Sequence, residues 1–255
     1  MTSSLQLIKT NSETLNSKIE IARLTTGSIL NTQNSISKTY LSTGITSLDR
    51  MLGGGLPMGT ISELTGSLSN GKTSVLFTLL AKATSEHLRI AYIDVFNTLD
   101  PHFARISGIQ LKQLFWIHFR KEPLSNKLNK SLKSANILTR SQNFDVIVLD
   151  LETASVCTSE AKIQKIPFHY WFRIKKALHQ KKIAFILLSH SSSAGSAATV
   201  RLGLKRSSVW WKSTQAVSKL NLSNHYELLR GFTTRVSLLK GGTHDQIKIY
   251  CHLQS

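Results

Sequence analysis

Residues 61–84 read ISELTGSLSNGKTSVLFTLLAKAT, and this stretch decides the fold. The short apolar segment ISELT leads into GSLSNGKT (Gly66–Thr73), which satisfies the pattern G-x-x-x-x-G-K-[ST], and a helical run follows at once. A strand, a glycine loop and a helix in this order form a phosphate-binding loop. Backbone N–H groups and the positive end of the helix dipole then surround the phosphates.

The residues of this loop have distinct expected roles. Gly66 and Gly71 supply backbone freedom, Lys72 reaches the β and γ phosphates, and the Thr73 hydroxyl binds magnesium. Asp150 ends the apolar strand FDVIVLD, where its carboxylate can hold the magnesium through water. The sequence therefore predicts ATP and Mg²⁺ as cofactors. The candidate nucleotide-binding residues of the loop are Gly66, Ser67, Leu68, Ser69, Asn70, Gly71, Lys72, Thr73 and Ser74.

Short apolar runs alternate with helical patterns along the middle of the chain. RIAYIDV, VIVLDL and IAFILLS are nearly continuous apolar runs, as in the buried central strands of a parallel sheet. Helical patterns follow them, including runs from Asn126 and from Phe168. The alternation predicts an α/β fold with a mainly parallel sheet and helices on both faces. Near the end, TTRVSLL and IKIYCHL flank Lys240–Gly242 and predict a hairpin of antiparallel edge strands.

Composition divides the chain of 255 residues into three parts. Residues 1–40 are polar and are expected to be an arm with one helix, 41–204 to be the nucleotide-binding core, and 205–255 to be a basic segment whose hairpin completes the sheet. The formal net charge is +18, and residues 101–255 carry 24 basic and 7 acidic side chains. A basic bias of this kind favours an anionic partner such as DNA, while a solubilising surface is the alternative.

The segment TGITSLDRMLGGGLPMGTISELTGSLSNGKTS resembles the entry segment of RecA-type ATPases, and AYIDVFNTLDPHFARISGI resembles the RecA segment that carries D-x-E-x-x-L-D-P. The likeness extends to about Leu204. It implies a RecA-like P-loop NTPase core, with Asp100 and Phe103 beside the nucleotide and Phe103 in the place of the stacking tyrosine. Phe96 replaces the catalytic glutamate, and general-base assistance of roughly 10²- to 10⁴-fold is lost with it.

Two further residues are candidates for catalytic work. Glu152 lies two residues after Asp150, so it faces the same side of an extended chain and is a candidate substitute base. His190 stands at the strand end where RecA proteins have a glutamine that senses the γ phosphate. The segments that carry the two DNA-binding loops of RecA are short here, roughly Thr153–Pro167 and the run after His190, which argues against strand exchange.

The run IPFHYWFRIKKALHQKKIAFILLSHSSSAGSAATVRLGL, followed by LLRGFTTRVSLLKGG, resembles the ImuA proteins of bacterial mutagenesis cassettes. This resemblance implies an accessory role in SOS damage-induced translesion DNA synthesis. The implied partners are a Y-family polymerase homologue and an error-prone replicative-type polymerase. Two other functions stay open: a DNA-dependent ATPase or recombinase, and a scaffold that works without nucleotide. RecA-like domains often assemble head to tail, so a homo-oligomer also stays open.

Basic and aromatic residues gather in the second part of the chain. Helical spacing predicts two inward-facing sets, Phe168, Trp171, Ile174 and Leu178 on one helix and Leu128, Leu132, Ala135 and Leu138 on another. Basic side chains lie on their outer faces. Together with Lys205, Arg206, Trp210 and Trp211 they are suited to DNA, including single strands. No apolar run approaches the roughly 18 residues of a membrane span, and the start has no signal-peptide core, so a cytoplasmic location is expected.

Overall fold

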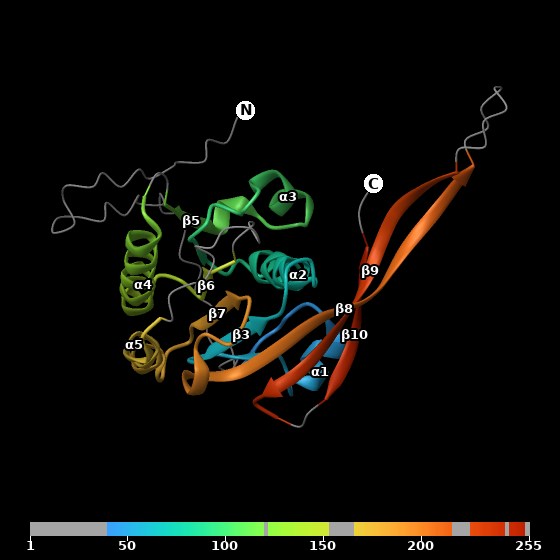
Figure 1. The fold of residues 1–255 in the computed structure, drawn as a ribbon. Helices are drawn as coiled ribbons and strands as arrows, with labels where there is room; N and C mark the ends of the chain where they lie inside the picture. Colours follow the sequence, from blue (N-terminus) through green and yellow to red (C-terminus); the bar gives the residue numbers. More distant parts are fainter. Residues whose placement is uncertain (1–39, 120–121, 153–165, 216–224, 243–244, 253–255) are drawn as a thin grey trace. The chain divides into compact units, whose positions relative to one another are not determined.

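The computed structural model describes residues 40–119, 122–152, 166–215, 225–242 and 245–252. Its centre is an eight-stranded sheet in the order β10-β9-β8-β3-β7-β6-β4-β5 (Figure 1). A separate two-stranded sheet pairs β1 (Tyr40–Leu41) with β2 (Leu56–Pro57). The strands of the large sheet are β3 (Ile61–Thr65), β4 (Ile90–Asp94), β5 (Leu114–His118), β6 (Val146–Asp150), β7 (Ala184–Ser189), β8 (Ala198–Gln215), β9 (His225–Lys240) and β10 (Gln246–His252).

Six neighbouring strands of this sheet, β8, β3, β7, β6, β4 and β5, run parallel to one another. The side chains of β3, β4, β6 and β7 are all buried, as expected of central strands with helices on both faces. The predicted α/β class is therefore confirmed. Parallel strands end at the same edge of the sheet, so the segments that follow β3, β4, β6 and β7 meet there.

Two hydrophobic cores lie on opposite faces of the sheet. The first contains α2 (Lys72–Ser85), α1 (Thr46–Met51) and α3 (Pro101–Ile106). The second contains α4 (Leu124–Ser141) and α5 (Phe168–Leu178), and Figure 1 shows these helices on the other side of the sheet from α2. Short 3-10 helices, η1 (Leu111–Gln113) and η3 (Gly195–Ala197), precede β5 and β8.

The C-terminal strands extend the sheet beyond β8. β9 is antiparallel to β8 and to β10, so the predicted hairpin at Lys240–Gly242 is confirmed. β8 continues from Ala198 to Gln215 without a break at Leu204, where the composition changes. The distal halves of β8 and β9 form a long two-stranded ribbon that leaves the helix-covered part of the sheet (Figure 1).

The helical faces follow the predicted pattern with one correction. Trp171, Ile174 and Leu178 of α5 and the four predicted residues of α4 are buried, but the Phe168 side chain is 61% exposed. Phe168 is the first residue of α5, and its ring lies over Gly195 of η3 rather than in the core. α4 begins at Leu124, two residues before the predicted start.

The predicted arm of residues 1–40 lies almost wholly outside the described residues, as does the segment 153–165. Residues 191–197, by contrast, are described, and they form a short turn and η3 before β8. Within the described ranges, no helix has the length and apolar character that crossing a membrane requires.

Candidate nucleotide-binding site

The loop GSLSNGKT joins the end of β3 to the start of α2. Gly66 has a φ of 148° and Gly71, the N-cap of α2, has a φ of 83°, both in the left-handed range that favours glycine. Ser69 also has a positive φ, of 58°. This backbone wraps the chain around the N-terminus of a helix of 14 residues, where unpaired N–H groups and the helix dipole favour an anion.

Lys72 is buried although it carries a charge. Its ammonium donates hydrogen bonds to the backbone oxygens of Gly66 and Ser67 and forms an ion pair with Glu152. The side chain thus folds back over the loop in which phosphates are expected. A buried ammonium held by a carboxylate and by carbonyl oxygens can exchange these partners for phosphate oxygens.

Two C-terminal strands hold the loop from behind. Asn70 donates its side-chain amide to the Leu204 carbonyl oxygen (3.0 Å) and accepts from the Arg206 N–H (3.2 Å), while its backbone oxygen accepts from the Thr234 hydroxyl (3.0 Å). Leu204 and Arg206 belong to β8 and Thr234 to β9. Sequence reasoning missed Thr234, because these bonds join residues more than 130 positions apart.

The glycines permit this close approach. A Cβ on Gly66 would lie 2.3 Å from the Leu204 oxygen, and one on Gly71 would lie 2.4 Å from the Thr234 hydroxyl oxygen. Both distances are shorter than any van der Waals contact. The loop therefore needs glycine at these positions for space as well as for backbone conformation.

Asp150 ends β6 beside Asp94, its register partner at the end of β4. Asp150 accepts hydrogen bonds from the Tyr92 hydroxyl (2.6 Å) and the Glu152 N–H (2.8 Å). Asp94 accepts from the N–H groups of Thr98 and Leu99 and from the Trp116 indole. Burial raises the pKa of Asp150 to about 7, and the nearby charges of Asp94 and Glu152 add to this, although its hydrogen bonds oppose the shift.

The oxygen donors beside the loop suit magnesium. Mg²⁺ prefers oxygen ligands and keeps several waters, so the exposed Thr73 hydroxyl would hold it directly and the Asp150 carboxylate through water. When bound with ATP, the ion would neutralise charge on the phosphates. Within the described part of the chain, no group of three His, Cys, Asp or Glu side chains is placed to hold a metal ion.

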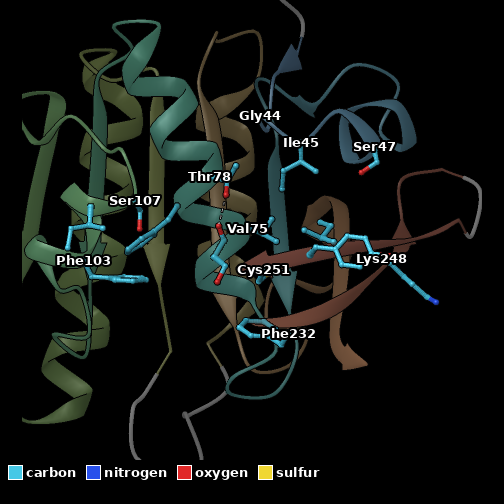
Figure 2. A pocket seen from close by; sticks show the side chains of 15 residues that line it. Gly44, Ile45, Ser47, Val75, Thr78, Phe103, Ser107, Phe232, Lys248 and Cys251 are labelled. Atoms are coloured by element: carbon cyan, nitrogen blue, oxygen red, sulfur yellow. Dashed lines mark hydrogen bonds between the residues drawn. The ribbon is translucent and has the colours of Figure 1, made fainter. Parts of the chain in front are cut away.

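A groove of about 710 Å³ runs along α2, between α3 on one side and α1, β9 and β10 on the other (Figure 2). Its volume is typical of small-molecule sites. Ser74 and Val75 line it near the phosphate loop, and Phe103 and Phe232 line it from α3 and β9. An exposed, mostly apolar groove that opens beside a phosphate loop fits the nucleoside part of a nucleotide.

Asp100 and Phe103 lie at this groove in different ways. The Phe103 side chain is 48% exposed and its ring centroid lies 5.7 Å from that of Phe77 of α2, so one face of the ring is free for stacking. Asp100 is the N-cap of α3, and its carboxylate accepts from the N–H groups of His102 and Phe103. Asp100 therefore fixes the start of the helix that carries Phe103.

The candidate catalytic residues meet near Lys72. Glu152 forms an ion pair with Lys72, whereas the Asp150 carboxylate is bonded to the Tyr92 hydroxyl. Burial raises the pKa of Glu152, while Lys72 and the nearby charge of His190 lower it. The His190 side chain is exposed, and its backbone oxygen accepts from the Gly66 N–H (3.2 Å). Phe96 packs against the core on the α4 and α5 side, so it offers no group to the phosphates.

Comparisons with known proteins agree with this geometry. Residues 12–165 match the RecA N-terminal domain family. One similar protein is "Protein RecA" of Clostridium acetobutylicum, which is 36% identical over 132 residues, or 51% of this chain. The aligned region spans 36% of that relative's own length, about a third of it.

Proposed function

Because this chain belongs to the RecA N-terminal domain family, we propose that it is an ATP-binding accessory protein in DNA repair. The observation that carries the proposal is the buried Lys72 ammonium, folded over a glycine loop at a helix N-terminus. A scaffold that works without nucleotide has no need of this arrangement. In the proposed complex Lys72 and the loop N–H groups hold the phosphates, Thr73 and Asp150 hold Mg²⁺, and Phe103 stacks on the base.

The proposed role uses ATP binding more than rapid turnover. Phe96 stands where RecA-type ATPases have a catalytic glutamate, and it packs away from the loop. An aromatic ring neither accepts a proton nor orients the attacking water, so hydrolysis is expected to be slow. Bound nucleotide would then act as a switch for assembly.

The finer proposal follows from the resemblance to ImuA proteins. In it, the chain acts in SOS damage-induced translesion synthesis beside a Y-family polymerase homologue and an error-prone replicative-type polymerase. The short segment 191–197 between β7 and β8 supports an accessory role over strand exchange.

A pull-down with and without nucleotide tests this role. Tagged chain is mixed with the two purified polymerases and with Mg²⁺ plus a non-hydrolysable ATP analogue, or with EDTA alone. We expect several-fold more polymerase to be captured with the analogue, and no such increase for Lys72→Ala. Equal capture under all conditions would show that nucleotide does not control binding of the polymerases, even if the chain binds ATP.

A second function, a DNA-dependent ATPase, has one observation in its favour: Glu152 lies within reach of Lys72. Replacing Glu152 with glutamine separates the two functions. If Glu152 only pairs with Lys72, Glu152→Gln frees the ammonium and removes a negative charge near the phosphates, so ATP-analogue affinity rises about tenfold. ATP turnover with single-stranded DNA then stays at its low wild-type level.

If instead Glu152 is the catalytic base, the same variant loses about a hundredfold or more of a DNA-stimulated turnover. Glu86→Gln is the matched control, because Glu86 pairs with Lys82 at the far end of α2. Turnover is measured by phosphate release, and affinity by titration with a fluorescent ATP analogue.

A further inference from the structure

The strands β8, β9 and β10 have one face that the core does not use. Leu204, Val236 and Ile249 point into the first core, next to α2. Side chains alternate along a strand, so their neighbours Lys205, Arg235 and Lys248 lie on the opposite face, and all three are exposed.

These basic residues form a row across the sheet. Lys205 of β8 is the register partner of Arg235 of β9, and Arg235 is the partner of Lys248 of β10. Neighbouring strands lie about 4.8 Å apart, so the row spans about 10 Å. Lys248 and Tyr250 also line the groove along α2, and Figure 2 shows the ammonium end of Lys248 pointing outward from it.

An aromatic pair stands beside the basic row on the same face. The rings of Trp210 and Tyr250 stack with centroids 5.3 Å apart and an interplanar angle of 27°. They come from β8 and β10, the two strands that flank β9, and Gly231 of β9, the register partner of Trp210, has no side chain to separate them. The Tyr250 side chain is 61% exposed, so this aromatic surface faces solvent.

The surroundings of this face are positively charged. The three strands contain eight lysines and arginines and one acidic residue, Glu227. Towards α5 the basic character continues: the pKa of Lys240 is lowered by burial and then by the charges of Arg201 and Lys175. Arg201 is paired with the buried Glu63, but Lys175 lies exposed on α5.

We propose that this face of β8–β10, the basic row with its aromatic pair, is a binding platform for single-stranded DNA. The basic row contacts phosphates, and the exposed ring of Tyr250, supported by Trp210, stacks on an unpaired base. Stacking needs bases that are free of a duplex, so the platform selects single strands. The proposal rests on the proposed role in DNA repair and gives it a site outside the segments that follow β6 and β7.

The platform lies behind the phosphate loop. Asn70 bonds to Leu204, Arg206 and Thr234, which are the chain neighbours of Lys205 and Arg235. A change in the loop on nucleotide binding therefore acts on the strands that carry the basic row. By linkage, if bound nucleotide changes the affinity for DNA by some factor, bound DNA changes the affinity for nucleotide by the same factor.

Anisotropy of a fluorescein-labelled oligothymidylate of 20 nucleotides, titrated with the full chain at several salt concentrations, tests the platform. The variant Lys205→Ala/Arg235→Ala should bind about tenfold more weakly, and the slope of log affinity against log salt should fall by about 1.4, which is about 0.7 for each basic side chain removed. Lys133→Ala/Arg140→Ala removes the same charge from the exposed face of α4 and should bind as the wild type does. Equal reductions in both variants would overturn the proposal, because net charge alone would explain them.

Tyr250→Ala tests the stacking. We expect affinity to fall about fivefold or more with an unchanged salt slope, and Tyr250→Phe to restore it. Tighter binding of duplex DNA, or of an RNA of the same length, would overturn the proposal. Lys205→Ala/Arg235→Ala should still bind an ATP analogue normally, so failure of the platform is distinguishable from failure of the nucleotide site.

Discussion

Replacing Lys72 with alanine is expected to weaken ATP-analogue binding about a hundredfold or more. The substitution removes an ammonium that would form charge-assisted hydrogen bonds with two phosphates. It also leaves the Glu152 carboxylate without its ion-pair partner and facing the phosphates, which adds repulsion. Titration with a fluorescent ATP analogue in the presence of Mg²⁺ measures the loss.

Two further variants make this result specific. Lys82→Ala removes an exposed lysine from the same helix and should leave the affinity unchanged. Lys72→Ala/Glu152→Gln should recover part of the loss, since the unpaired carboxylate is gone. An affinity of Lys72→Ala equal to that of the wild type would show that this loop is not the nucleotide site, whatever the family implies.

The central fold was predictable because its signals are local. The phosphate loop has a fixed spacing, and buried parallel strands such as VIVLD and AFILLS are continuous apolar runs. The ribbon of β8 and β9 was not predictable, because KRSSVWWKSTQ has no apolar run longer than VWW and its strand character comes from pairing with residues 225–235. Phe168 was wrongly placed in the core, because helical spacing says nothing of the first residue of a helix, where the packed layer ends.

The candidate site also has parts that the sequence predicts and parts that depend on the order of the strands. The loop residues and Asp150 follow from motif and strand ends, but the partners of Asp150 depend on which strands are neighbours. Tyr92 and Asp94 lie next to Asp150 because β4 pairs with β6. The apolar strand IAYID, with its terminal carboxylate, was a signal that could have placed Asp94 at this edge of the sheet.

The raised pKa of Asp150 leads to a prediction about stability. Because the folded-state pKa is about 7 and the ordinary value is 3.8, the folded chain holds the proton more tightly than the unfolded chain. Stability from this group is thus fully present below pH 3.8 and is lost as the pH rises to about 7. Each pH unit in that window costs the wild type at most about 1.4 kcal/mol.

Asp150→Asn removes this cost while keeping the shape of the side chain. The quantity to follow is the unfolding free energy of the variant minus that of the wild type. As the pH rises from about 5.5 to about 8.5, this difference should increase by about 2 kcal/mol, and nearly all of the increase should occur below about pH 7.5. Urea unfolding in EDTA, followed by tryptophan fluorescence, measures this difference without bound metal. Tyr92→Phe should move the midpoint to higher pH, because the Tyr92 hydroxyl bond stabilises the ionised carboxylate. If the difference between Asp150→Asn and wild type instead stays constant across this range, Asp150 is already ionised at about pH 5.5 in the folded protein. Asp150 would then need to lose no proton before it binds magnesium at neutral pH.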